Sequence, residues 1–409
     1  MIKVLRAPWV LPIATPPIRD GWMAVSDGRI LDVGSADVLP DALRGAAIDT
    51  ADPSLRDVVL LPGLVNAHAH LELSWMRGRL PPCDSMPAWA ASLMALRRGE
   101  QVDPVPAVED AIAAMYASGT TLVGDVANTD VTFGPLSRSR LSAIVLRELI
   151  GFRVEDPAPP VDDAQQQLDA APRSARLRGT LVPHAPYSVS PALLRRLAAH
   201  DAEAPLSIHL AESIAELTFL ESGTGPWREV LESVGAWHPG WQPPGCGPVE
   251  YLDRLGLVGS RLLAVHGVHL SAAEIDRLAA AGATIVACPR SNAWTGAGTP
   301  PIEAFYESGV RVAIGTDSLA SVDTLSLFDE MAALRRLAPG VPASRILRSA
   351  TLDGALALGF GAELGSFEPG KRAEVIAVRV PEGLDDVGEY LVGGVRPEDV
   401  VWVHTPDSR

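Results

Sequence analysis

From residue 58 onward, the sequence alternates short runs rich in Val, Ile, Leu and Thr with stretches whose apolar residues recur every three or four positions. The short runs predict strands and the longer stretches predict helices, so the chain predicts repeated βα units and a parallel sheet. Eight strands are predicted, at residues 58–65, 121–125, 143–149, 180–184, 206–210, 262–266, 284–288 and 310–314. Helices are predicted at residues 105–116, 191–200, 272–281 and 325–337. Because eight parallel strands close a (β/α)8 TIM barrel, we expect an α/β fold of that class.

Residues 1–57 and 365–409 depart from this pattern, because Pro and Gly interrupt their short apolar segments. Short strands between such turn residues are typical of a small β-domain. We expect the two ends to pair into one composite β-sandwich, with the TIM barrel at 58–364. A long connection at 213–257 separates the fifth and sixth strands, and we expect it to form a structured cap over the barrel mouth.

The composition argues against several classes of partner. The 34 basic and 50 acidic residues give a formal net charge of −16, which disfavours nucleic acid and anionic membrane surfaces and favours a small-molecule substrate. Cys83, Cys246 and Cys288 are scattered and odd in number, so neither a disulfide framework nor a cysteine-based zinc site is expected. No apolar run is long enough to cross a bilayer, and prolines interrupt the N-terminal stretch where a signal peptide would lie. We therefore expect a cytoplasmic protein and allow for a homodimer.

Side chains that can bind metal follow the predicted strands at their carboxyl ends, where TIM barrels build their active sites. His68 and His70 stand two residues apart at the end of the first strand, so both point to the same face of it. A pair of histidines can also be a surface or core feature, so the argument depends on the other strand ends. These carry His184, His209, Glu212, His266 and Asp317.

We expect the metal ligands to be His68, His70, His209 and Asp317, with one further position open for water, as a catalytic site requires. A bound divalent ion lowers the pKa of such a water toward about 7, which makes hydroxide available at neutral pH.

Three residues are predicted to handle protons. Glu212 lies three residues after His209, where it could pass a proton to a leaving group or ring nitrogen; the alternative is a first-turn glutamate stabilised by the dipole of the next helix. His266 is predicted to orient the attacking water and stabilise developing charge. Asp317 has a second predicted role as the base that takes the water proton, because one carboxylate oxygen can face the metal and the other the water.

The substrate-binding predictions rest on fewer signals. His184 could bind a substrate hydroxyl or ring nitrogen, or it could be a core histidine with its hydrogen bonds satisfied. Arg290 follows the seventh strand and could pair with a substrate carboxylate, while Asn292 could order the loop or contact the substrate. Glu148 lies near the end of the third strand and could equally form a structural ion pair.

With these residues in view, the chain resembles the amidohydrolase superfamily, in the branch of cytosine, guanine and S-adenosylhomocysteine deaminases and triazine hydrolases. The matching motifs cover almost the whole chain and are Pro62-Gly63-Leu64-Val65-Asn66-Ala67-His68-Ala69-His70, His209-Leu210-Ala211-Glu212, His266, Gly315-Thr316-Asp317-Ser318 and Gly365-Ser366-Phe367-Glu368-Pro369-Gly370-Lys371. The resemblance implies a metal-bearing barrel with a composite β-sandwich, and hydrolytic loss of ammonia from an aminated heterocycle.

The number of metal ions follows from the lysines. Two-metal members of the superfamily commonly bridge their ions with a carboxylated lysine on a barrel strand, whereas the only lysines here are Lys3 and Lys371, outside the predicted barrel. We therefore expect one divalent metal ion per chain, with zinc as the first choice and iron as the alternative.

Within that branch, further motifs look like those of the aminodeoxyfutalosine deaminases of menaquinone biosynthesis. They are Leu71-Glu72-Leu73-Ser74, Thr224-Gly225-Pro226-Trp227-Arg228, Pro244-Gly245-Cys246, Cys288-Pro289-Arg290-Ser291-Asn292 and Asp317-Ser318-Leu319-Ala320-Ser321. This likeness implies an enzyme that acts on C–N bonds other than peptide bonds, with 6-amino-6-deoxyfutalosine as substrate. The alternatives are a deaminase of adenosine, 5′-methylthioadenosine or S-adenosylhomocysteine, another C–N or C–Cl hydrolase of the branch, and a barrel that binds a ligand without catalysis.

Overall fold

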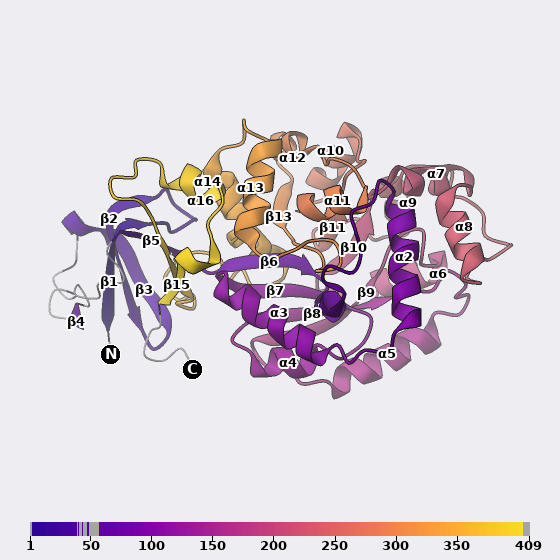
Figure 1. The fold of residues 1–409 in the computed structure, drawn as a ribbon, viewed down its shortest axis with the longest axis horizontal. Helices are drawn as coiled ribbons and strands as arrows, with labels where there is room; N and C mark the ends of the chain where they lie inside the picture. The colour runs from indigo at the N-terminus through magenta and orange to yellow at the C-terminus, as the bar shows by residue number, and fades with distance from the viewer. Residues whose placement is uncertain (1, 39, 41–42, 44–46, 49–56, 404–409) are drawn as a thin grey trace. The chain divides into compact units, whose positions relative to one another are not determined.

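The computed structural model describes residues 2–38, 40, 43, 47–48 and 57–403. Eight strands form two four-stranded sheets with the orders β6-β7-β8-β9 and β10-β11-β12-β13 (Figure 1). Their bounds are β6 Leu64–Ala69, β7 Thr120–Ala127, β8 Ser142–Leu149, β9 Leu177–Pro183, β10 Leu206–Leu210, β11 Leu262–His266, β12 Thr284–Ala287 and β13 Arg311–Ile314. β8 pairs with β9 in parallel, and β10 to β13 pair in parallel with their neighbours. The predicted succession of parallel βα units is therefore confirmed.

The two sheets join at both edges and so close a barrel. At one edge the His209 amide donates to His184 O, just after β9, at 2.9 Å. At the other edge the Thr316 amide donates to His68 O at 3.0 Å, and Ala69 and Asp317 form a parallel bridge. Every residue of β7, β10 and β11 is buried, as expected of barrel strands covered by helices. The predicted (β/α)8 fold is confirmed.

The first predicted strand, residues 58–65, is wrong in its extent. β5 (Val58–Pro62) belongs to a different sheet, and the barrel begins with β6 after Gly63. Pro62 has no amide hydrogen to donate, and a Cβ on Gly63 would lie 2.7 Å from Thr121 Cβ, so the chain changes sheets at a position that needs glycine.

Helices connect the strands, and the four predicted helices are observed as α3 (Val105–Ala117), α6 (Pro191–Ala198), α10 (Ala272–Ala280) and α13 (Leu327–Leu337). Their starts follow local rules: Ser190 accepts a hydrogen bond from the Leu193 amide at the start of α6, and Ser271 forms a capping box with Glu274 at the start of α10. The other helices are η1 Ala36–Val38, η3 Leu71–Met76, α2 Met86–Gly99, α4 Phe133–Arg138, α5 Ala158–Ala170, α7 Ile214–Ser222, α8 Pro226–Ser233, α9 Pro248–Arg254, α11 Pro289–Thr295, α12 Ile302–Ser308, α14 Ala343–Ser349, α15 Leu352–Ala357, α16 Val387–Val392 and η4 Pro397–Asp399.

The long connection at 213–257 has structure of its own, since it contains α7, α8 and α9. Ser213 begins α7 by accepting a hydrogen bond from the Glu216 amide, and Gly223 ends it with a φ of 70°. Phe219, Trp237 and Trp241 pack as an aromatic group within the connection, with ring centroids 4.7 Å apart for Phe219 and Trp241.

The two ends of the chain meet in a second, seven-stranded sheet with the order β15-β14-β5-β1-β2-β3, in which β4 also pairs with β1. Its strands are β1 Lys3–Val10, β2 Ile18–Ser26, β3 Arg29–Ser35, β4 Ala47–Ile48, β5, β14 Val375–Arg379 and β15 Val400–Val403. Its core includes fully buried Leu5, Val10, Met23, Leu60 and Val375. The predicted composite β-domain is confirmed; residues 1, 39, 41–42, 44–46, 49–56 and 404–409 of its predicted segments lie outside the described residues.

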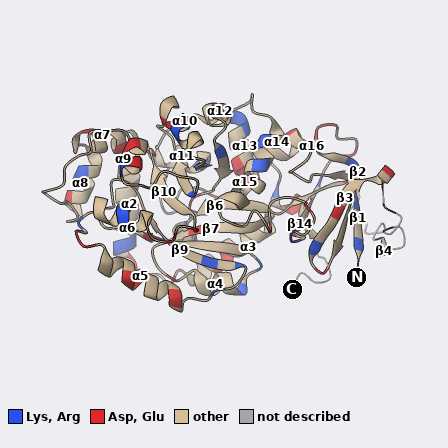
Figure 2. Ribbon diagram, turned by 180° about the vertical axis from the view of Figure 1, so that it is seen from behind, with Lys and Arg blue, Asp and Glu red and all other residues tan. Residues whose placement is uncertain are grey.

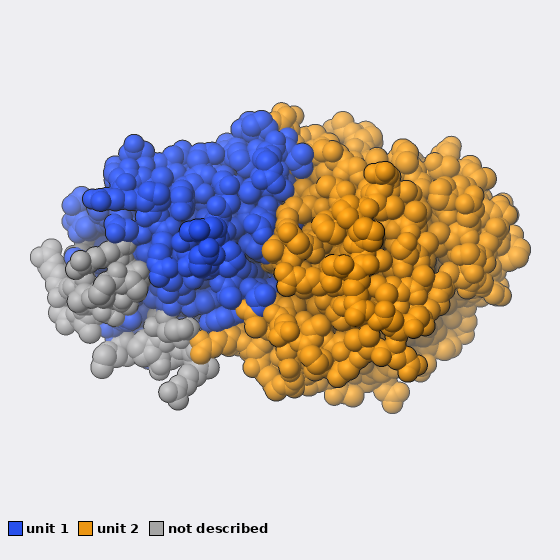
Figure 3. Space-filling model, in the orientation of Figure 1, with its two compact units in different colours: residues 1–66, 114–122, 326–409 blue, residues 67–113, 123–325 orange. Residues whose placement is uncertain are grey.

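The chain divides into two compact units, coloured separately in Figure 3. Unit 1 contains Met1–Asn66, Ala114–Leu122 and Ser326–Arg409, and unit 2 contains Ala67–Ala113 and Val123–Leu325. The domain boundaries at 57/58 and 364/365 stay a prediction. Figure 2 shows Lys and Arg residues interspersed with Asp and Glu along the helices. No helix in the described part of the chain is long and apolar enough to span a membrane.

Candidate active site

The predicted metal ligands lie together in unit 2, at the carboxyl ends of the barrel strands. His68 is on β6, His70 follows it, His209 is on β10, and Asp317 follows β13. The ring centroids of His68 lie 4.8 Å from His70 and 5.0 Å from His209. Asp317 Oδ1 is 3.5 Å from His70 Nε2 and 4.0 Å from His68 Nε2. Three imidazoles and one carboxylate therefore converge on one small volume.

The backbone turns sharply where the site residues leave the strands. Ala211, His266 and Asp317 have φ values of 50°, 74° and 62°, a left-handed region that residues other than glycine seldom adopt. Strained conformations of this kind persist where the surrounding structure holds them, and they concentrate at functional sites. Glu216 supports the first of these turns, because its carboxylate accepts the amides of Ala211 and Glu212 at 2.9 and 3.0 Å.

The donor atoms of this group suit a divalent metal ion. Those of His68, His70 and Asp317 lie within 4.8 Å of one another, and so do those of His68, His209 and His266. Burial, the largest effect, lowers the pKa of His68 and of His70, which keeps both imidazoles neutral with a lone pair to offer. His209 Nε2 is also buried and lies 3.6 Å from Glu148 Oε1. Histidine nitrogen with one carboxylate is a donor set typical of catalytic zinc.

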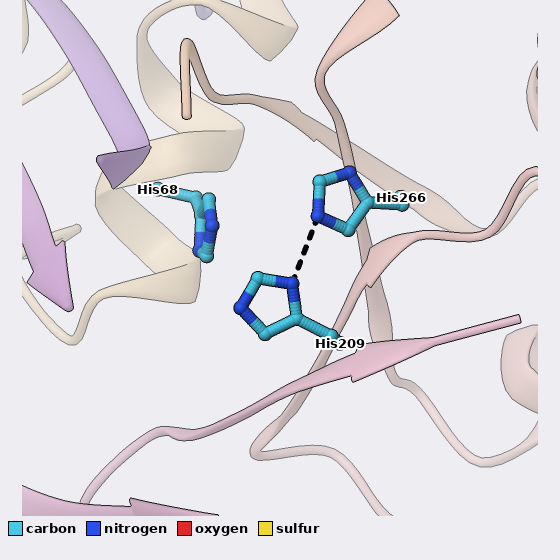
Figure 4. A group of neighbouring side chains, drawn as sticks. All are labelled: His68, His209 and His266. Carbon is cyan, nitrogen blue, oxygen red and sulfur yellow. Dashed lines mark hydrogen bonds between the residues drawn. The ribbon is translucent and has the colours of Figure 1, made fainter. Parts of the chain in front are cut away.

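His266 lies beside this group rather than within the predicted ligand set. Figure 4 shows the His209 and His266 rings joined by a hydrogen bond, with the His68 ring edge-on to both. The bond connects His209 Nδ1 and His266 Nε2 at 2.9 Å. Burial, followed by the neighbouring histidines, lowers the pKa of His266 well below its ordinary value, so this ring is neutral.

Glu212 is a buried carboxyl group that can hold a proton at neutral pH. Its oxygens lie 3.7 Å from His209 Nδ1 and 3.5 Å from His266 Nε2. Burial is the largest effect and raises the pKa of Glu212 to about 8, with Asp317 and Glu216 adding to the rise against the opposing effect of His209. A carboxylic acid with such a pKa can donate a proton and take one back near neutrality.

A cavity of about 470 Å³ opens onto these groups, also within unit 2. Its polar wall includes six residues at or just beyond strand ends, which are His70, Glu148, His184, His209, Glu212 and Asp317. Its apolar wall comes mainly from α2, the loop after β8 and α8, with Trp89, Leu93, Phe152, Trp227, Val230 and Leu231 among its members. The volume lies within the range of small-molecule and cofactor sites.

The three predicted substrate-binding residues have different surroundings. His184 lines the cavity; its Nδ1 is 2.5 Å from Ser188 Oγ, and burial lowers its pKa to about 4. Arg290 does not line the cavity, and its guanidinium binds Asp323 and Thr324. Asn292 does not line the cavity either. It is fully buried, and its side chain contacts His266.

A polar network on the cavity wall was missed by the sequence analysis. Asn128 Nδ2 donates to Glu148 Oε2 at 2.8 Å, and Glu148 Oε1 lies 3.6 Å from His209 Nε2. Arg97 donates to Asn128 Oδ1 at 2.8 Å and to Glu72 Oε1 at 3.0 Å. Burial alone would raise the pKa of Glu148, but His184 and His209 hold it well below the ordinary value. The sequence analysis named Glu148 at a strand end, like the histidines, with a structural ion pair as the alternative, but it did not predict the contacts with Asn128 and His209.

Comparison with known proteins agrees with this geometry. Residues 59–391 match the model of the amidohydrolase family. The 5-methylthioadenosine/S-adenosylhomocysteine deaminase of Moorella thermoacetica is 32% identical to this chain over 418 residues, which cover 96% of this chain and 90% of that protein. The aminodeoxyfutalosine deaminase of Deinococcus radiodurans is 33% identical over 358 residues, covering 82% of each chain.

Solved structures give the same fold. An adenosine deaminase from Xanthomonas campestris with bound zinc has a TM-score of 0.79 and 30% identity, and the match covers 97% of this chain and 90% of that one. The aminofutalosine deaminase of Helicobacter pylori has a TM-score of 0.83 at 23% identity, covers 98% of this chain and 100% of that one, and supports the fold alone. The family match spans most of the sequence and includes every predicted metal ligand, so the chain belongs to the amidohydrolase family, as the motifs predicted.

Proposed function

We propose that this protein is a hydrolytic deaminase that replaces the exocyclic amino group of a 6-aminopurine nucleoside with oxygen and releases ammonia. The observation that carries the proposal is the pairing of a carboxyl group protonated near neutrality, Glu212, with a metal-binding group on one cavity wall. Relatives that cover most of the chain are named deaminases of adenine-containing substrates, which supports the same reaction.

The proposed metal ligands are His68, His70, His209 and Asp317. A bound divalent cation would lower the pKa of a water molecule and stabilise negative charge as the water adds to the substrate carbon. We propose one such ion per chain, since the barrel contains no lysine to hold a second. For its identity we propose zinc, with iron as the alternative, because histidine nitrogen with one carboxylate is a donor set typical of catalytic zinc. Metal analysis of purified protein tests this, and two tightly held ions per chain would contradict it.

The residues of the chain move the protons. Asp317 takes the proton of the attacking water, and His266 orients that water. Glu212 gives its proton to the ring nitrogen next to the reacting carbon, so that carbon accepts the water oxygen and becomes tetrahedral. The proton that Asp317 took from the water then passes to the amino group, the C–N bond breaks, and ammonia leaves. The remaining water proton, on the new hydroxyl group, returns to Glu212 as the carbonyl forms, so both carboxyl groups regain their starting states. Each of these groups lies within 4 Å of at least one other site residue.

For the finer substrate we propose 6-amino-6-deoxyfutalosine. Support comes from the narrower motif likeness and from the Deinococcus radiodurans relative. The apolar cavity wall offers contact to an aromatic substituent beyond the ribose. Since the Arg290 guanidinium binds Asp323, we assign the substrate's carboxylate to Arg153, which lines the cavity and is exposed.

A second candidate is 5′-methylthioadenosine. The same apolar wall suits a thioether, and the Moorella thermoacetica relative carries that substrate in its name. The two candidates differ in charge, so replacing Arg153 separates them. We expect Arg153→Met to raise KM for the carboxylate-bearing substrate and to leave KM for 5′-methylthioadenosine unchanged.

The experiment that tests the function measures ammonia release from metal-quantified protein. The panel contains aminodeoxyfutalosine, adenosine, 5′-methylthioadenosine, S-adenosylhomocysteine, guanine and cytosine, together with a chlorinated triazine that reports a C–Cl hydrolase. We expect the highest kcat/KM for aminodeoxyfutalosine. Preference for another adenine nucleoside would replace the fine substrate and keep the reaction. Chloride release alone, or no turnover of any compound, would overturn the deaminase proposal.

A further inference from the structure

α11 follows directly after β12 and carries two adjacent polar residues into the interior of unit 2. Ser291 and Asn292 are both fully buried, and neither lines the cavity. Buried polar side chains need hydrogen-bond partners to offset their lost hydration. The partners of these two residues are the two groups that are proposed to handle the water.

Ser291 binds one of the two carboxylate oxygens of Asp317, and the other oxygen faces the metal-binding group. Its hydroxyl donates to Asp317 Oδ2 at 2.5 Å, and its Oγ lies 2.9 Å from Ser321 Oγ. Asp317 Oδ1 is left facing His70 Nε2 at 3.5 Å. The hydroxyl therefore fixes the rotation of the carboxylate, so that one oxygen points at the metal-binding group.

Asn292 selects the side of the His266 ring that carries the proton. Its amide nitrogen donates to His266 Nδ1 at 3.0 Å, so that nitrogen must offer a lone pair. A neutral His266 ring then carries its proton on Nε2. That nitrogen faces Glu212 Oε1 at 3.5 Å and His209 Nδ1 at 2.9 Å.

We propose that Ser291 and Asn292 are positioning residues for the reaction: the first turn of α11 orients Asp317 through Ser291 and sets the proton position of His266 through Asn292. The kinetic part of this inference rests on the proposed deamination, whereas the orientation of Asp317 and the tautomer of His266 do not. Because neither residue reaches the cavity, we expect the loss of either to lower turnover and to leave substrate binding unchanged. Only the loss of Ser291 should also weaken metal retention, because Ser291 contacts the proposed ligand Asp317.

The first test removes the Ser291 hydroxyl in the metal-loaded protein. We expect Ser291→Ala to lower kcat by roughly 10- to 100-fold at unchanged KM, and to speed the transfer of metal to a chelator, as observed when groups that orient metal ligands are lost. Ser291→Thr keeps a hydroxyl and should restore most of both properties. Chelator transfer needs no substrate, so this arm is informative even if the deamination proposal fails.

The same helix provides a matched control. Thr295 is also buried on α11, and its hydroxyl has no hydrogen bond to any described residue. Thr295→Val removes a hydroxyl of similar burial and should leave kcat and metal transfer at the wild-type values. If Ser291→Ala matches Thr295→Val in both measurements, the role of Ser291 is refuted.

The second test replaces Asn292 with its isostere. Aspartate can only accept a hydrogen bond when ionised, so Asn292→Asp should move the His266 proton to Nδ1. Nitrogen-15 NMR of histidine-labelled protein reports this directly: we expect the Nε2–H form in the wild type and the Nδ1–H form in the variant. The variant should keep its metal and lose turnover. An Nδ1–H wild type, or wild-type kcat in Asn292→Asp, would overturn the assignment.

Discussion

At the scale of single residues, the proposed chemistry depends on one buried carboxyl group that keeps its proton. Glu212→Gln has nearly the same shape but no proton to transfer, so we expect kcat to fall by roughly 10²- to 10⁴-fold. Metal content should stay at the wild-type value, because Glu212 is outside the proposed ligand set. Steady-state ammonia release and metal analysis on the same sample check both parts. Glu221→Gln, at an exposed position on α7, is the control, and equal turnover in the two variants would remove Glu212 from the mechanism.

A second prediction concerns the close approach of two strand ends. A Cβ on Gly315 would lie 2.7 Å from His68 Cβ and 2.8 Å from His68 O, and a backbone atom cannot move away as a side-chain end can. We expect Gly315→Ala to lower the free energy of unfolding by about 1–3 kcal/mol and to weaken metal binding, because His68 must shift.

Thermal unfolding and chelator competition measure the two effects of Gly315→Ala. Gly134→Ala, in α4, is the control, since the nearest atom to its added Cβ is Arg138 Nη1 at 3.5 Å and alanine favours a helix. A Gly315→Ala protein with wild-type stability and metal affinity would show that the approach tolerates a methyl group.

The types of the site residues could be predicted from the sequence, but their contacts could not. Strand order alone places His68, His209 and Asp317 at one end of a barrel, and the structure brings them together there. The hydrogen bond from Ser291 to Asp317 depends on the φ of 62° at Asp317 and on the course of α11, which no local pattern encodes. Arg290 shows the same limit, since no local pattern indicates that its guanidinium binds Asp323.

At the scale of elements, the barrel strands were predictable because each is a short buried run between helices with clear starts. β10 and β11 have the predicted bounds. The run at 58–65 misled because apolar residues stand on both sides of Pro62-Gly63, although the chain passes from one sheet into another at this point. The close approach of Gly63 to Thr121, a tertiary property, confirms the change of sheet that the Pro-Gly pair only suggests.

The apolar wall of the cavity gives a prediction about an element, α8. Val230 lines the cavity and is half-buried, so Val230→Ala removes two methyl groups from the wall with little loss of core packing. We expect KM for nucleosides with a large apolar 5′ substituent to rise by up to about tenfold, with kcat unchanged. KM for adenosine should change less, because it has no such substituent.

Steady-state kinetics on the two kinds of nucleoside test the role of α8. Ser233→Ala on the same helix is the control, because Ser233 is exposed and does not line the cavity. Equal changes in KM for both substrates would mean that Val230 contacts the shared part of the nucleoside, which would contradict the placement of the 5′ group at α8.

At the scale of the whole molecule, all proposed site residues belong to unit 2, while the composite sheet belongs to unit 1. β6 and β7 begin in unit 1 and end in unit 2, and each carries site residues or their supports at its end. Asp125 on β7 is one such support, because its Oδ1 accepts the amide of Leu71, next to His70, at 2.9 Å. The protonation state of the Asp125 carboxyl group therefore affects the stability of the fold.

The stability of the protein should fall with rising pH because of Asp125. Burial, the largest effect, raises the pKa of Asp125 from 3.8 to about 7, and the hydrogen bond from Leu71 opposes the rise only in part. Between pH 4 and 7 the folded protein therefore holds a proton that the unfolded chain has released. As the pH rises through that window, the contribution of Asp125 to the free energy of unfolding falls by up to about 1.4 kcal/mol per pH unit. Above the window this contribution is constant.

An asparagine side chain cannot titrate, so the substitution Asp125→Asn should remove this slope while its amide oxygen keeps the bond from Leu71. We expect the Tm of the variant minus that of the wild type to increase from pH 4.5 to about 7 and then to stay level, whether or not metal is bound. Asp110→Asn, at an exposed position on α3, should give a much smaller pH-dependent difference. A constant difference in Tm between the Asp125→Asn and wild-type proteins across this range would mean that the buried carboxyl is already ionised at the acidic end of it.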